Sequence, residues 1–233
     1  LEAETGLSAQ FQRSGRIIPL PKPHLAVIAR RHQADALQNW HQGDQQFFWQ
    51  VDEAPAVAGY LSPDFGEGGY VHDTLAARIA PRALISLLKA WLERQPNVRV
   101  IEHAALGKME AAKGRAEVLL AASAQTITFS HILISAGVDA FPMLEALLPP
   151  LPKPLGVGVK GQAALFQADI DPAWPVAFLD GIYIVPHEGG RVAVGSTSEN
   201  TYAEPHTTDQ LLDVVIDKAR ALVPALRTAE IIE

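Results

Sequence analysis

A glycine-rich stretch, Gly156–Gly161, is the segment whose spacing points most directly to a chemistry, because it matches the dinucleotide pattern G-x-G-x-x-G. That pattern holds a pyrophosphate only when a strand enters it and a helix leaves it, since the helix N-terminus supplies the N–H donors. Here the proline-rich run 149–154 comes before it, and residues 162–166 after it have a strand composition. We therefore predict glycines that ease entry into a strand, and no pyrophosphate loop.

Other motifs that carry side-chain chemistry are absent from the sequence. It contains no P-loop pattern and no nucleophile elbow G-x-S-x-G, and Ser196 lies in a predicted strand. The absence of cysteine excludes disulfides, thiolate nucleophiles and cysteine-ligated metals. The 8 histidines form neither H-x-H nor H-E-x-x-H, so we predict no metal site. An unrelated α+β hydrolase is disfavoured for the same reasons.

Two segments have the composition of ligand-facing strands. The run 131–138 is apolar and ends in Ser135, Ala136 and Gly137, where small residues let a ligand approach the backbone closely. In 181–186 the two-residue period of a strand places Tyr183 and Val185 on one face, opposite two isoleucines. Packing against a neighbouring element explains either segment equally well when it is considered alone.

The elements that must position these residues are mixed in type. Apolar runs and turn signals predict strands at 15–20, 24–29, 57–61, 69–72, 98–101, 131–135, 157–167, 182–186 and 191–197, with a hairpin over 116–120 and 126–129. Helical spacing predicts helices at 33–43, from Pro81 to about 95, at 140–147 and at 208–222, the last capped by Thr207 or Thr208. The proline run 149–154 is the clearest boundary.

Composition sets broad limits on function. The chain has 233 residues, 48% of them hydrophobic, and a net charge of −7 with a pI near 5.6. These values favour a globular protein and disfavour nucleic acid or an anionic membrane as the main partner. No apolar run is long enough to span a bilayer, and the lack of cysteine is compatible with a cytoplasmic location. From the residues at its two ends, we expect the chain to be an internal part of a longer protein.

The order of several degenerate segments resembles the D-amino-acid-oxidase-type family of FAD-dependent oxidoreductases, with the glycine oxidases of thiamine biosynthesis as the nearest group. The resemblance runs from about Ser14 to the end of the chain. It is carried by Pro81-Arg82-Ala83-Leu84, Ile101-Glu102-His103, Ser135-Ala136-Gly137, Val159-Lys160-Gly161-Gln162, Tyr183–Pro186, Gly190–Thr197 and Leu222–Leu226. The resemblance implies that the family's dinucleotide loop would lie before residue 1 and its substrate-carboxylate arginine shortly after Glu233.

The resemblance implies an α+β (mixed α/β) fold in which two domains are interleaved. Residues 1–77 and 149–233 would form a β-rich substrate-binding domain, and 78–148 would be part of a Rossmann-like FAD-binding domain. Leu106, in a strand passing the adenine, and Ser135, Ala136 and Gly137 would contact FAD. Tyr183 would bring its hydroxyl to the substrate carboxylate. His187, an arginine in the family pattern, is expected on an exposed turn, and Arg191 is expected to pair with Asp180 or Glu188.

The activity implied is oxidation of a C–N bond in a small amine or amino acid, such as glycine, sarcosine or a D-amino acid, with FAD as cofactor. Catalytic side chains are not required, because the flavin carries the chemistry. The segment by itself is expected to be inactive. A dehydrogenase that uses an acceptor other than oxygen, and a ligand-binding module without catalysis, remain open, as does a homo-oligomer.

Overall fold

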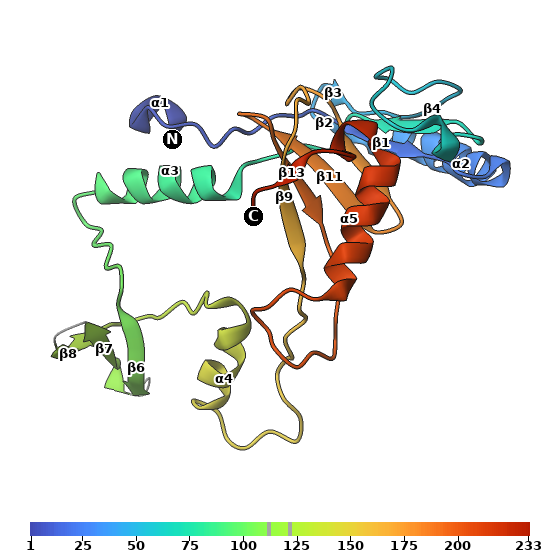
Figure 1. Cartoon of the computed structure of the whole chain (residues 1–233). Helices are drawn as coiled ribbons and strands as arrows, with labels where there is room; N and C mark the ends of the chain where they lie inside the picture. Colours follow the sequence, from blue (N-terminus) through green and yellow to red (C-terminus); the bar gives the residue numbers. More distant parts are fainter. Residues whose placement is uncertain (111–112, 121–122) are drawn as a thin grey trace. The chain divides into compact units, whose positions relative to one another are not determined.

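The computed structural model describes residues 1–110, 113–120 and 123–233. The chain divides into two compact units, one made of Leu1–Ala90 with Lys160–Glu233 and the other of Trp91–Val159. We call them unit 1 and unit 2. Figure 1 traces the elements of each along the chain. The two ends of the sequence therefore build one unit together, and the middle of the sequence builds the other.

Unit 1 is organised around an eight-stranded mixed sheet in the order β13-β9-β12-β11-β10-β1-β5-β4. Its strands are β1 (Arg16–Pro19), β4 (Trp49–Asp52), β5 (Tyr70–Asp73), β9 (Ala163–Gln167), β10 (Val176–Leu179), β11 (Ile182–His187), β12 (Arg191–Gly195) and β13 (Glu230–Ile231). All neighbours pair antiparallel except β1 with β10. Smaller elements of unit 1 are α1 (Glu2–Thr5), the pair β2 (His41–Gln42) and β3 (Gln45–Gln46), and the 3-10 turns η1 (Pro63–Phe65) and η4 (Pro224–Leu226).

Helix α5 (Gln210–Leu222) covers one face of this sheet over β9, β12 and β11 (Figure 1). Its apolar residues recur at helical spacing, so Leu212, Val215 and Ala219 are buried on one side. They share a core with Phe166 and Ile184, whose side chains are fully buried. The predicted threonine cap is wrong. Asp209 caps the helix instead, because α5 begins later and the Asp209 carboxylate accepts a hydrogen bond from the Leu211 N–H.

Helix α2 (Pro23–Asn39) covers the opposite face, over β4 and β5. The predicted strand at 24–29 is therefore wrong. A short apolar run fits a strand or a helix equally well, and here Pro23 at the first helical turn and the alanines 26 and 29 facing Val71 decide for the helix. The Trp49 indole N–H donates to the Ala29 carbonyl at 3.0 Å, which fixes the helix against β4.

Other differences from the predicted elements lie in loops and at strand ends. Residues 57–61 form turns and not a strand, although Tyr60 and Leu61 are buried, because burial here comes from packing on the core and not from strand pairing. The predicted strand 157–167 is shorter, beginning at Ala163. Strands β4 and β10 were not predicted. The strands near 15–20, 69–72, 182–186 and 191–197 and the helix from Pro81, α3 (Pro81–Glu93), are confirmed.

Unit 2 contains a three-stranded antiparallel sheet of β6 (Ala105–Glu110), β7 (Arg115–Leu120) and β8 (Ser123–Thr128), followed by η3 (Gly137–Asp139) and α4 (Ala140–Glu145). The predicted hairpin and helix are thus confirmed. The strands predicted at 98–101 and 131–135 are wrong: both segments are irregular, and Leu133 is 89% exposed. Apolar, β-branched composition favours a strand only where another strand is available to pair with it, and neither segment has such a partner in the described part of the chain.

The predicted mixed α/β class is confirmed by this architecture. Assignment of the chain to substrate and FAD domains at 1–77, 78–148 and 149–233 stays a prediction. Among the described residues, none of the helices has both the length and the apolar character needed to cross a bilayer.

Candidate functional site

The face of the large sheet that points away from α5 is open over β9, β12 and β11. Side chains alternate along these strands, so the residues between the buried ones project to this side. Tyr183 on β11 lies on it and is 42% exposed. The open face therefore presents an aromatic hydroxyl from a rigid strand, not from a mobile loop.

The surroundings of Tyr183 are small on one side and aromatic on the other. Tyr183 pairs across the ladder with Gly195 of β12, and Gly195 pairs with Ala163 of β9. A Cβ placed on Gly195 would come within 3.0 Å of the Ala163 Cβ, so this row has little room for larger residues. On the other side the Phe178 ring lies 4.6 Å from the Tyr183 ring, centroid to centroid. The Tyr183 ring therefore has small residues on one side and the Phe178 ring on the other.

A cavity of about 360 Å³ opens on the same face near the other end of the β11–β12 hairpin. Its lining comes from strands β9, β11 and β12, the start of α3 and both chain ends. The charged or titratable residues in it are Arg82, His187, Arg191 and Glu233. Tyr183 is not part of the lining, so the cavity and the predicted substrate contact are separate features. We base the candidate site on Tyr183, because it is the residue that the family resemblance assigns to the substrate.

His187 occupies a different place from the one predicted. It closes β11, half-buried beside the cavity, and does not lie on the exposed turn that follows. Burial lowers the pKa of His187, and Arg78 and Arg191 lower it further, so the imidazole is neutral at pH 7. Its Nδ1 is buried and has no hydrogen-bond partner among the described residues. The sequence prediction misplaced this histidine, because strand alternation alone does not mark where a strand ends and its turn begins.

The arginines of the cavity are both engaged. Arg82 pairs with the Glu233 carboxylate through both terminal nitrogens, which raises the pKa of Arg82 and lowers that of Glu233. The Arg191 Nε–H donates to the Glu188 carbonyl at 3.2 Å. The predicted ion pair of Arg191 with Asp180 or Glu188 is therefore wrong, because the backbone oxygen within the turn is nearer to the guanidinium than either carboxylate.

The residues predicted to contact FAD all lie in unit 2. Ser135 and Ala136 belong to an irregular segment, and Gly137 begins η3 with a positive φ of 57°. A Cβ built on Gly137 meets nothing within 4 Å, so the backbone there is open to a ligand. Leu106 is half-buried in β6, beside a register shift between β6 and β7. This open backbone fits the approach of a flat cofactor, but the contacts themselves remain predictions.

Metal chemistry has no support in the described residues, which contain no cluster of three or more His, Asp or Glu side chains able to hold an ion. The open face presents the Tyr183 hydroxyl as a polar group that a small molecule could contact.

Known proteins share this architecture. The chain is 30% identical over 203 residues to a glycine oxidase of Pseudomonas putida, covering 86% of this chain and 53% of the relative. Among solved structures, glycine oxidase from Geobacillus kaustophilus matches all of this chain and 60% of its own with a TM-score of 0.71 at 18% identity. Iminodiacetate oxidase from Chelativorans sp. BNC1 matches 96% and 59% with a TM-score of 0.69 at 23% identity. At these identities the solved structures establish the fold alone.

The matches cover only part of the length of the relatives, whereas the family model matches all of this chain. It spans about half the length of the two glycine oxidases it matches in Pseudomonas species, 53% and 47%. The family model for FAD dependent oxidoreductases, of the DAO type, matches the chain along its whole length, residues 1–233. The chain belongs to the DAO family of FAD-dependent oxidoreductases.

Proposed function

We propose that the protein containing this chain oxidises the C–N bond of a small amine or amino acid with FAD as its cofactor. The observation that carries the proposal is Tyr183, half-exposed on a rigid strand of the open sheet face in a chain of an FAD-dependent family. The names of the relatives support an amino-acid substrate, since they include glycine oxidases. The proposal covers glycine, sarcosine and D-amino acids, because Gly195 and Ala163 beside Tyr183 carry no side-chain polar group that would select among them.

In this proposal the protein binds and orients while the cofactor supplies the redox chemistry. When bound, the flavin supplies a two-electron acceptor for the hydride that leaves the substrate α-carbon. Leu106, Ser135, Ala136 and Gly137 would contact FAD through their accessible backbone. The Tyr183 hydroxyl would donate to the substrate carboxylate, and the Phe178 ring would keep the hydroxyl in place by restricting rotation of the phenol.

Two alternatives share the same features. A dehydrogenase that passes electrons to an acceptor other than oxygen would use the same substrate face. A ligand-binding module would use it without catalysis. A cytoplasmic location, the domain assignment at 1–77, 78–148 and 149–233, and a homo-oligomer also stay predictions.

The test uses the full-length protein and an absorbance scan from 300 to 550 nm. We expect flavin bands, and we expect glycine, sarcosine or a D-amino acid to bleach them without oxygen. Recovery of the bands in air supports an oxidase, and recovery only with an artificial acceptor supports the dehydrogenase. Bands that no amino acid bleaches support the binding module, and a protein without bands even after addition of FAD contradicts the proposal.

The role of Tyr183 has its own test. A hydrogen bond to a charged group contributes about 1.5–3 kcal/mol, so Tyr183→Phe should raise KM by about tenfold or more with a smaller change in kcat. Tyr70→Phe is the matched control, because the Tyr70 side chain is buried in the core and its hydroxyl cannot reach a substrate. Equal effects of the two substitutions would contradict the assigned contact.

A further inference from the structure

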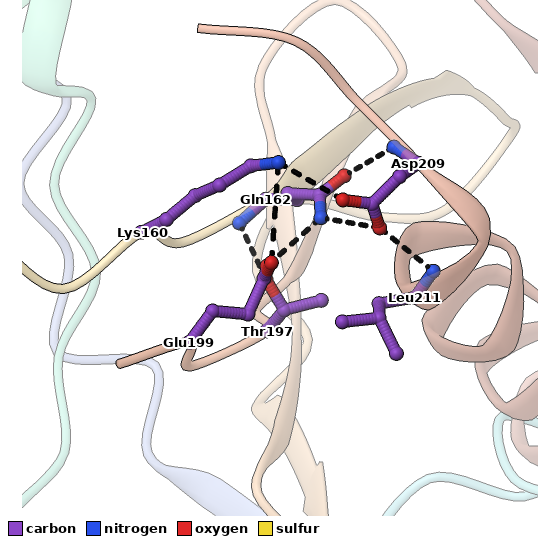
Figure 2. A network of polar contacts seen from close by, with 6 residues as sticks. All are labelled: Lys160, Gln162, Thr197, Glu199, Asp209 and Leu211. Carbon is purple, nitrogen blue, oxygen red and sulfur yellow. Dashed lines mark hydrogen bonds and ion pairs between the residues drawn. The ribbon is translucent and has the colours of Figure 1, made fainter. Parts of the chain in front are cut away.

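A mostly buried polar network, in which only part of the Asp209 side chain is exposed among its charged groups, lies at the edge of the open face, where three segments of the chain meet. Lys160 and Gln162 precede β9, Thr197 and Glu199 follow β12, and Asp209 caps α5 (Figure 2). As whole residues, Lys160, Gln162 and Glu199 are only 7%, 4% and 9% exposed. Polar and charged groups so deeply buried require partners, since an unpaired one is costly.

Gln162 is the centre of the network. Its Nε2 donates to Glu199 Oε1 and to Asp209 Oδ1, both at 2.8 Å, and its Oε1 accepts from the Asp209 N–H at 2.8 Å (Figure 2). The orientation of the amide is fixed, because the carboxylates only accept and the backbone N–H only donates. One side chain therefore ties β9 to the loop after β12 and to the helix cap.

Lys160 and Thr197 complete the network. The Lys160 ammonium donates to Asp209 Oδ2 at 2.9 Å and lies 3.9 Å from Glu199 Oε2. The Thr197 hydroxyl donates to Glu199 Oε1 at 2.6 Å and accepts from the Gln162 N–H at 2.9 Å. Backbone bonds between Lys160 and Glu199 run in both directions, at 3.0 and 2.9 Å. The segment after β12 is thus held by side chains and main chain together.

The network begins two residues after Gly195, which is the cross-strand neighbour of Tyr183. Gly195, the last residue of β12, pairs with Tyr183, and Thr197 is already bonded to Gln162. Ser196 and Ser198, on either side of Thr197, are exposed, while Glu199 is buried. The inward residues therefore fix which side chains of this segment face outward next to Tyr183.

Stability alone is a weak reason for such a network. Replacing a buried ion pair with apolar residues is often neutral or stabilising, because desolvation offsets the attraction. A fully bonded network instead specifies a single arrangement of the segments that it joins. Here the network fixes the position of the residues that follow Gly195, the cross-strand neighbour of Tyr183.

We propose that Lys160, Gln162, Glu199 and Asp209 are positioning residues that clamp residues 196–200 beside Tyr183 and so shape the substrate side of the open face. The kinetic consequence rests on the proposed oxidation of an amine or amino acid, whereas the structural consequence does not. Without the clamp, Thr197 and Glu199, which follow β12, should separate from Gln162 and Lys160 while the centre of β12 stays paired. The substrate would then meet a disordered edge beside Tyr183.

The experiment measures amide hydrogen exchange in the full-length protein carrying Gln162→Leu or Lys160→Met. We expect the amides of Thr197 and Glu199 to exchange about tenfold faster or more, with Val192 and Val194 at the centre of β12 unchanged. Lys218→Met is the control, because it removes the same charge from an exposed position on α5. Glu199→Gln keeps the acceptor for Thr197 and Gln162, so it should fold even if the other variants do not and should show a smaller increase.

The kinetic part of the experiment uses the same variants with the amino acid that bleaches the flavin. KM should rise about fivefold or more with little change in kcat, because substrate positioning is lost and the flavin chemistry is not. Uniform exchange along β12, or no increase at 197 and 199, overturns the clamp. Faster local exchange with an unchanged KM overturns its role in substrate positioning. Failure of the wild-type protein to oxidise any amino acid would contradict the proposed function, while the exchange data would still decide whether the clamp exists.

Discussion

Units 1 and 2 both contain apolar segments with a strand-like composition, but those at 98–101 and 131–135 in unit 2 are largely exposed. In unit 1 the side chains of Phe166 and Val192 are fully buried between the sheet and α5. In unit 2, Leu133 is 89% exposed and Val100 is also exposed, in segments outside any sheet. The composition is similar and the difference lies in the neighbours, so burial in this protein depends on partner strands and a covering helix more than on residue type.

Phe166→Ala should cause the largest loss in the free energy of unfolding among the substitutions that test this contrast. The ring is fully buried under α5, and truncating a buried phenylalanine costs about 3–5 kcal/mol, because transfer and cavity terms add. Urea unfolding followed by fluorescence of the tryptophans measures the loss. A change below about 1 kcal/mol would show that the core of unit 1 tolerates the cavity and would break the contrast.

The pH dependence of unit 1 should be visible through Asp209. Hydrogen bonds from Gln162 and Lys160, together with that from the Leu211 N–H, lower the pKa of Asp209 to about 2. A depressed folded-state pKa gives stability that is present above the unfolded pKa, about 4, and lost as the pH falls toward the folded value. The free energy of unfolding should therefore decrease between pH 4 and about 2.

Asp209→Asn supplies the comparison for that prediction. Asparagine caps a helix as well as aspartate does but does not titrate, so the wild-type and variant curves should converge as the pH falls through this window. Urea unfolding at a series of pH values measures both curves. Parallel curves down to pH 2 would show that the Asp209 carboxylate keeps its ordinary pKa.

Leu133→Ala should have almost no effect on the 233-residue chain. The side chain is 89% exposed, and exposed substitutions usually change the free energy of unfolding by less than about 0.5 kcal/mol. The measurement is the same urea unfolding used for Phe166→Ala. A loss above about 2 kcal/mol would place Leu133 in a packed environment and remove the distinction between the two units.

The smallest effect is expected at Glu110 in unit 2. Hydrogen bonds from the exposed side chains of Lys113 and then Lys108 lower the pKa of this carboxylate. Salt at about 1 M screens exposed charges, so the pKa of Glu110 should return toward its ordinary value, whereas that of Asp209 should move less because Lys160 is buried. An NMR titration of both carboxylates at low and high salt makes the comparison. An equal response would show that the network around Asp209 is as open to solvent as the pair in unit 2.

The amino-acid sequence determined several features directly. Alternation in 182–186 and 191–197 predicted β11 and β12 and placed Tyr183 and Val185 on one face, because a strand has a period of two residues. Helical spacing after Pro81 and through Leu212 and Val215 predicted α3 and α5. The shared order of short segments indicated the FAD-dependent family, which the match over residues 1–233 confirmed.

Tertiary structure alone decided the rest. Residues 24–29 form a helix whose apolar side packs against β4 and β5. Residues 98–101 and 131–135 are irregular, because no described strand pairs with them. The network of Lys160, Gln162, Glu199 and Asp209 joins residues up to 49 positions apart, a distance over which sequence periodicity carries no signal. Local patterns record which face of an element is apolar, but the partner of that face is set by the packing of the whole chain.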